Sequence, residues 1–147
     1  ARGENNLDVN QSGWLGYNGR IKILPSDFRA DSDDSTANYA MTSAHNGGSG
    51  RVMNKFLEAI GMWTIPNGFK ATNCILYASA TIGAQVYECN TATSTATSKG
   101  TGNASSAPSV INFTDITAST TNYIAIRLDF TSTTHYFYGG HITIDRV

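Results

Sequence analysis

The sequence predicts an all-β fold, an antiparallel β-sandwich of jelly-roll type in a single domain. The first observation is the strict alternation of residues 122–130, which indicates a strand with one buried and one solvent-facing side. Its apolar set is Ile124, Ile126, Leu128 and Phe130, and the set between them is Tyr123, Ala125, Arg127 and Asp129. The second observation is composition: charged residues make up only 14%, and Thr, Ser, Ala, Asn and Gly stand in their place, as in sandwiches rather than helical bundles. The third is that strand-like segments recur at roughly 8–12-residue intervals.

These segments lie between clusters of Gly, Asn and Ser. In residues 20–24, Ile21 and Ile23 share one face and Pro25 ends the run, so this segment is expected to be the first core strand. The other candidate strands are residues 74–79, 85–90, 109–113, 135–138 and 141–145.

Residues 51–60 place apolar side chains at helical spacing, but the same residues can lead into a strand, and both alternatives stay open. We expect a strand over residues 61–65 and a turn at residues 66–68, because Pro fixes φ and Gly accepts a positive φ. Residues 26–50 and 91–108 are loop candidates. A Thr/Ser run such as 91–108 can also extend as a polar edge strand or pack against a partner chain.

Cys74 and Cys89 are the only two cysteines, too few for a four-ligand zinc site. If Thr81 and Ile82 form a two-residue hairpin turn, counting outward by pairs brings Cys74 directly opposite Cys89. This predicts cysteines on adjacent strands and allows a cross-strand disulfide. The alternative is a pair of small buried thiols, which a reducing cytosol favours.

The charge balance argues against two classes of partner. The net charge is −1 and the pI is near 6.3, so no basic surface is expected for nucleic acid or anionic lipid. No apolar run approaches the ~18 residues of a membrane span, and the amino terminus lacks the apolar core of a signal peptide. We therefore expect a soluble protein made in the cytosol. Ala1 fits removal of an initiator Met, which predicts a complete small protein.

No motif predicts a metal site, a cofactor or a catalytic residue. The acidic run of residues 31–34 fails the EF-hand pattern, because Thr36 stands where Gly is needed and Thr42 where the bidentate Glu is needed. His45, His135 and His141 lie in no local metal-binding arrangement. No nucleophile elbow or phosphate-binding glycine loop is present in the sequence. A glycosidase pair among residues such as Glu4, Glu58 and Glu88 stays open, because that chemistry needs only two carboxyl groups at a set separation.

Aromatic residues are the main candidates for recognition, because they offer flat apolar faces with polar tips that suit both sugars and protein interfaces. Tyr136 and Tyr138 are the candidates for an aromatic surface, and Trp63 is expected in the core. Residues 1–19 are predicted to be an amino-terminal arm or docking segment and residues 20–147 the sandwich. In that arm Trp14 and Tyr17 are the docking candidates, unless Trp14 folds back onto its own core.

Six short sequence segments, taken together in their order and spacing, resemble a group of small virion structural proteins of marine tailed bacteriophages. The segments are residues 23–28, 65–72, 86–88, 100–103, 121–124 and 138–144. The chain departs from that pattern in residues 45–50 and at Cys74 and Cys89. The resemblance implies a β-sandwich displayed on a phage particle, with no catalytic residue to carry over.

Together these observations predict a non-enzymatic virion structural protein, a capsid decoration or cement subunit displayed in many copies. Its expected partners are other capsid or tail proteins and further copies of itself, since a particle multiplies weak contacts. The alternative is a carbohydrate-binding adhesin or tail-fibre receptor-binding module that contacts a host surface glycan.

Overall fold

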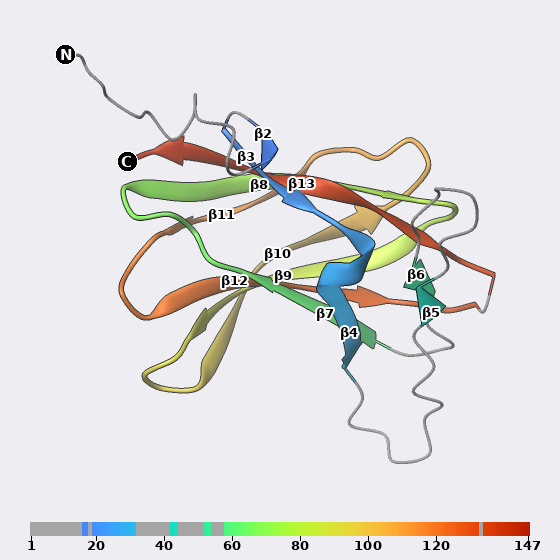
Figure 1. Ribbon diagram of the computed structural model, residues 1–147, viewed down its shortest axis with the longest axis horizontal. Helices are drawn as coiled ribbons and strands as arrows, with labels where there is room; N and C mark the ends of the chain where they lie inside the picture. The colour runs from blue at the N-terminus through green and yellow to red at the C-terminus, as the bar shows by residue number, and fades with distance from the viewer. Residues whose placement is uncertain (1–15, 18, 32–41, 44–51, 54–57, 133) are drawn as a thin grey trace.

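The computed structural model describes residues 16–17, 19–31, 42–43, 52–53, 58–132 and 134–147, and these form a two-layered antiparallel β-sandwich. In Figure 1, β8 and β13 of one sheet lie above β9 and β12 of the other. The five-stranded sheet has the order β10 (Thr95–Ala104), β9 (Ile82–Asn90), β12 (Asn122–Asp129), β7 (Glu58–Trp63) and β4 (Phe28–Asp31). The predicted fold class is confirmed.

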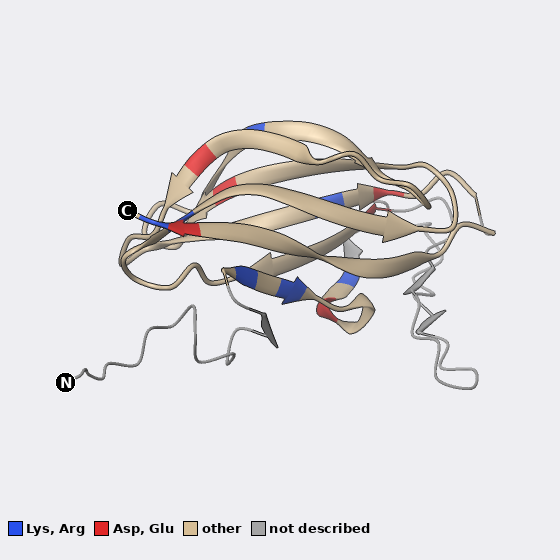
Figure 2. Ribbon diagram, turned by 90° about the horizontal axis from the view of Figure 1, so that it is seen from above, with Lys and Arg blue, Asp and Glu red and all other residues tan. Residues whose placement is uncertain are grey.

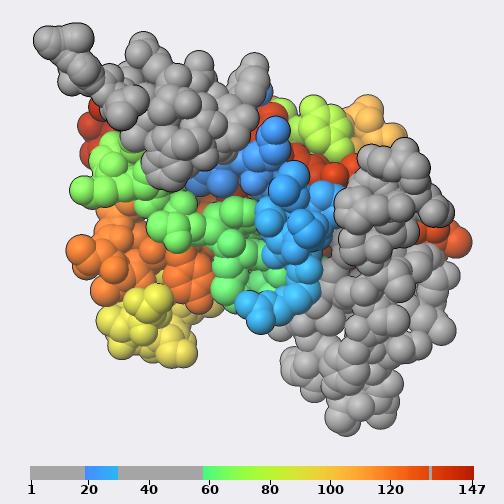
Figure 3. Space-filling view, viewed as in Figure 1, coloured from blue at the N-terminus to red at the C-terminus, as the bar shows by residue number. Residues whose placement is uncertain are grey.

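The second sheet has seven strands. Its main path is β11 (Ile111–Thr117), β8 (Phe69–Ala78), β13 (Phe137–Arg146), β3 (Arg20–Ile23) and β2 (Gly16–Tyr17). Off this path, β6 (Val52–Met53) pairs with β13, and β5 (Thr42–Ser43) pairs with β6. Figure 3 shows the surface of the five-stranded sheet near β4, with β7 in green between β4 in blue and β12 in orange.

The core lies between the two sheets. Ile124, Ile126 and Leu128 of β12 are fully buried, which confirms the inward face that the alternation predicts. Ala125 is also buried, but on the outer face, where its paired neighbours across the sheet are Tyr87 and Met62. A small side chain is thus covered by two larger ones.

Two predicted strands, 135–138 and 141–145, are one continuous strand, β13. The glycine pair between them does not break it, because Gly139 takes a φ of 129° at a bulge and pairing with β8 resumes at once. Residues 91–108 contain the polar edge strand β10, the alternative that the Thr/Ser run allowed. A bulge between Ser98 and Gly100 interrupts its pairing with β9.

The ambiguous segment before residue 61 contains strands among its described residues, β6 and the first part of β7. The predicted turn at residues 66–68 is confirmed: the Phe69 N–H donates to the Pro66 carbonyl at 3.1 Å, and Gly68 has a φ of 87°. Residues 26–50, expected to be a loop, include the short helix η1 (Pro25–Asp27) and the strand β4.

Phe28 of β4 explains why that strand forms. It is buried and packs edge-to-face on Trp63 and Phe137, with ring centroids 5.5 and 4.9 Å apart. Trp63 packs against the core as predicted, and its indole N–H donates to the Asp27 side chain at 3.3 Å. Burial of large aromatic rings stabilises β4, the last strand of this sheet among the described residues.

The predicted position of the cysteines is wrong. Cys74 lies on β8 of the seven-stranded sheet and Cys89 on β9 of the five-stranded sheet, and both are free and buried. Thr81 and Ile82 do not close a hairpin, because the chain crosses there from one sheet to the other. Counting outward by pairs assumed that consecutive strands are neighbours, and a sandwich often joins consecutive strands across its two layers.

Candidate functional site

The outer face of the five-stranded sheet collects polar and aromatic side chains from three central strands. Because β12 buries Ile124, Ile126 and Leu128, its other residues point outward, and β9 and β7 follow the same two-residue period. We call this surface the Arg127 face. It consists of Tyr123, Ala125, Arg127 and Asp129 from β12, Gln85, Tyr87 and Cys89 from β9, Glu58, Ile60 and Met62 from β7, and Ala96 from β10.

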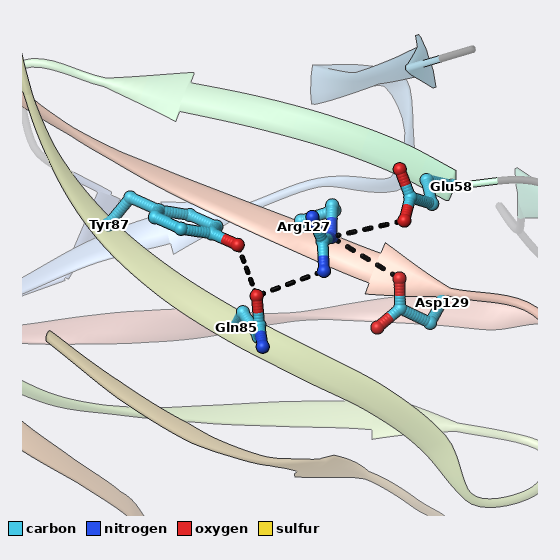
Figure 4. A network of polar contacts seen from close by, with 5 residues as sticks. All are labelled: Glu58, Gln85, Tyr87, Arg127 and Asp129. Atoms are coloured by element: carbon cyan, nitrogen blue, oxygen red, sulfur yellow. Dashed lines mark hydrogen bonds and ion pairs between the residues drawn. The ribbon is translucent and has the colours of Figure 1, made fainter. Parts of the chain in front are cut away.

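Arg127 lies at the centre of a polar network (Figure 4). Its Nη2 donates a hydrogen bond of 2.9 Å to Oε1 of Gln85, and the Tyr87 hydroxyl donates to the same oxygen. Its Nε lies 3.5 Å from a carboxylate oxygen of Glu58 and 3.3 Å from one of Asp129. The guanidinium carbon lies 5.7 Å from the centroid of the Tyr87 ring. Contacts from all four residues therefore fix one orientation of the guanidinium group.

Two polar atoms of the network have no hydrogen bond. Nε of Arg127 and Oδ1 of Asp129 are buried and close enough for an ion pair, but neither has an aligned hydrogen bond. A buried polar atom without a hydrogen bond costs roughly 1–3 kcal/mol.

Beside the network is a hollow of about 280 Å³. Its lining is mostly apolar: Ile60, Tyr87, Cys89, Ala96, Ala125 and Arg127. A second hollow, of about 410 Å³, lies at the end of the sheet and includes Met62, Tyr123 and the polar loop of residues 119–122. The two belong to one surface, because Met62 pairs with Ala125 and Tyr123 pairs with Cys89. From Asp129 to Tyr123 this surface extends roughly 20 Å at the usual rise of a strand.

The thiol of Cys89 is a neutral part of this surface. Burial raises the pKa of Cys89, against a hydrogen bond with Tyr123 that lowers it. Cys74, in the core, is further from ionising, since burial raises its pKa to about 12. Both side chains therefore act as small apolar groups near neutral pH.

The two carboxylates of the network share one partner. Glu58 and Asp129 are cross-strand partners, and the Nε of Arg127 contacts both of them. Within the described part of the chain, no three His, Cys, Asp or Glu side chains come together as a metal site requires.

The two tyrosines predicted to form an aromatic surface differ in exposure. Tyr138 is 46% exposed on the outer face of the seven-stranded sheet, beside Tyr77. Tyr136 is half-buried just before β13, where its backbone N–H donates to the Ser79 hydroxyl at 2.9 Å. Trp14 lies outside the described residues. The backbone of Tyr17 lies in β2 and pairs with Arg20, so the seven-stranded sheet includes two residues of the predicted docking segment.

The Arg127 network was not predicted from the sequence. A signal existed in the two-residue spacing of Arg127 and Asp129 and of Gln85 and Tyr87, which puts each pair on one face of its strand. The missing information was which strands are neighbours.

No helix among the described residues is long and apolar enough to cross a membrane. No protein-family model and no curated protein matches the sequence. One similar solved structure is that of the CBM22-1 and GH10 modules of the N-terminal endo-1,4-β-D-xylanase 10B of Clostridium thermocellum, complexed with xylohexaose. The match has a TM-score of 0.47 and 14% identity, and covers 88% of this chain and 28% of that one. At these values, what that protein binds does not transfer to this chain.

Proposed function

We propose that the protein is a glycan-binding module whose Arg127 face binds an uncharged oligosaccharide lying along β12. One observation carries the proposal: the Arg127 guanidinium is held by Gln85, Glu58 and Asp129 beside the Tyr87 ring, at the border of an apolar hollow.

The chemistry of this face matches that of a sugar ring. A pyranose has an apolar C–H face and a rim of hydroxyl groups that both donate and accept. Tyr87, Ile60 and Ala125 supply an apolar surface, whereas Gln85, Arg127 and the carboxylates supply planar donors and acceptors next to it. Recognition sites combine apolar walls with a few fixed polar groups in this way. Because the polar side chains already hold one another, little side-chain entropy is lost on binding.

The charge of the network favours an uncharged ligand. Glu58 and Asp129 carry two negative charges against the one positive charge of Arg127. An anionic sugar would therefore meet net repulsion at the point where its polar groups must bind.

The length of the face favours a chain over a single sugar. The two hollows follow one another along β12, from Arg127 to Tyr123. A ligand that fills both buries more apolar area than one that fills either alone. Affinity is thus expected to rise with oligosaccharide length until both hollows are filled.

Calorimetric titration with uncharged oligosaccharides of increasing length tests the proposal. We expect measurable binding that strengthens with length, a loss of about tenfold or more for Tyr87→Ala, and no change for Arg146→Ala on the opposite sheet. Circular dichroism and thermal melting show whether each variant is folded. Equal affinity of folded Tyr87→Ala and the unaltered protein for every ligand would contradict the proposal.

The virion role predicted from the sequence stays a prediction, since most of its docking segment lies outside the described residues. The two roles are compatible, because β2, in which that segment ends, belongs to the sheet opposite the Arg127 face. Mass spectrometry of purified particles would test the virion role. A subunit present in many copies supports it, and particles that lack the protein contradict it.

A further inference from the structure

The outer face of the seven-stranded sheet has a hollow of its own, of about 380 Å³. It lies between β3, β8 and β13, on the opposite side of the sandwich from the Arg127 face. Its lining residues are Lys22, Ile23, Leu24, Tyr77, Tyr138, Gly139, Gly140 and His141.

The floor of this hollow is backbone, because two glycines follow one another in β13. A Cβ at Gly140 would lie 2.0 Å from the Ile75 carbonyl oxygen, and one at Gly139 would lie 2.7 Å from that of Ile23. The φ of 129° at Gly139 is also one that other residues rarely adopt. Packing within the sheet thus requires glycine at both positions, and no side chain stands between Tyr138 and His141.

Exposed aromatic side chains border the glycine floor. Tyr77 and Tyr138 are 44% and 46% exposed, and Gly139 is the direct cross-strand partner of Tyr77. Leu24, 47% exposed, adds an apolar side chain to the same hollow. Exposed apolar side chains that gather around one hollow mark a binding surface.

The charge around this hollow is positive. In Figure 2 the Lys and Arg of β3 form a short basic strip on a sparsely charged sandwich. Lys22 is exposed, and none of the described carboxylates forms an ion pair with it. Asp27, at the nearby η1, uses one carboxylate oxygen for the Leu24 N–H and the Trp63 indole. Burial and the charge of Arg20 lower the pKa of His141, so its imidazole is neutral near pH 7 and can both donate and accept hydrogen bonds.

We propose that this hollow is a second binding site, for a saccharide that carries a carboxylate or sulfate group. Tyr77 and Tyr138 pack on the C–H face of the sugar ring, and the glycine floor lets the ring approach the backbone. Lys22 pairs with the anionic group, and His141 hydrogen-bonds a hydroxyl. This site does not depend on the Arg127 face. It prefers an anionic saccharide, whereas the Arg127 face prefers an uncharged one.

Backbone amide chemical shifts of the isotope-labelled protein test this proposal with two pairs of probes. One pair is glucuronic acid and glucose, and the other is galactose 6-sulfate and galactose. We expect shifts in β3, β8 and β13 with at least one acidic probe, with an affinity about fivefold or more above that of its uncharged partner. That anionic preference should weaken as salt is added, because the site is open to solvent. Comparing the two acidic probes distinguishes a carboxylate ligand from a sulfate ligand, and either one supports the proposal.

Three variants separate this site from the rest of the molecule. As read from the shifts of β3, β8 and β13, Lys22→Gln should reduce the affinity for the acidic probe to that of the uncharged one, and Tyr138→Ala should abolish binding of both probes at this hollow. Thr114→Ala, at an exposed position of β11 outside both sites, should leave these affinities unchanged. The proposed function is read from the shifts of β7, β9 and β12 instead, so failure here is distinct from failure there. The proposal is overturned if acidic and uncharged probes bind equally, or if Lys22→Gln keeps the full anionic preference in a folded protein.

Discussion

Arg127 of β12 and Gln85 of β9 are direct cross-strand partners, and their side chains are joined by a hydrogen bond of 2.9 Å. The same Gln85 oxygen accepts the Tyr87 hydroxyl, so one amide fixes both the cation and the aromatic ring of the Arg127 face. One uncharged side chain therefore joins the cation and the aromatic ring of this face.

Replacing Gln85 with Leu should weaken binding of an uncharged oligosaccharide about tenfold while lowering stability by about 2 kcal/mol. The variant removes the acceptor that orients Arg127 and Tyr87, so two hydrogen bonds are lost, and a typical one contributes about 1 kcal/mol to folding. Gln85→Glu keeps the acceptor oxygens and is the matched control, expected to retain most of the affinity. Equal losses in the two variants would show that orientation by Gln85 is unimportant.

Replacing Ile126 with Asp should prevent folding. Ile126 is fully buried between the sheets, and a buried unpaired carboxylate costs several kcal/mol against a total stability of ~5–15 kcal/mol. Thr114→Asp, at an exposed position of β11, should leave the melting temperature nearly unchanged. Similar melting curves for both variants would mean that the faces of these strands are assigned incorrectly.

Replacing Gly140 with Ala should be strongly destabilising, by about 3 kcal/mol or more, because its Cβ would lie 2.0 Å from the Ile75 carbonyl oxygen and the backbone would have to move. Gly83→Ala is the matched control in another strand, since the nearest atom to its Cβ would lie at 3.8 Å. Denaturant unfolding measures both. A cost below 1 kcal/mol at Gly140 would contradict the tight packing of β13 on β8.

The stability of the protein should fall as the pH rises from about 9 toward about 12. Burial raises the pKa of Cys74 from 9.0 to about 12, so in this range the unfolded chain loses a proton that the folded chain keeps. The contribution is fully present below pH 9 and is lost by roughly 1.4 kcal/mol per pH unit above it. Cys74→Ala should be less stable at neutral pH but should show a shallower alkaline decline. Parallel pH profiles for the two proteins would count against burial of this thiol.

The sequence was sufficient for the fold class and for the inward face of β12, because strict alternation depends on one strand alone. It was not sufficient for pairing between strands. Cys74 and Cys89 are fifteen positions apart and lie in different sheets, whereas Glu58 and Asp129 are far apart in sequence and are direct partners. Because strand pairing was not predictable, the composition of the two surfaces was not predictable either. Tyr138 was predicted as an exposed aromatic, but the position of Tyr77 beside it and the Arg127 network depend on which strands lie side by side.

Glycan binding by the Arg127 face is tested most directly by a map of backbone amide chemical shifts during titration with an uncharged oligosaccharide long enough to fill both hollows. We expect saturable shifts in β7, β9 and β12, centred on Arg127 and extending to Tyr123, which disappear in folded Tyr87→Ala. Saturable shifts confined to the seven-stranded sheet, or no shifts with any such ligand, would contradict it.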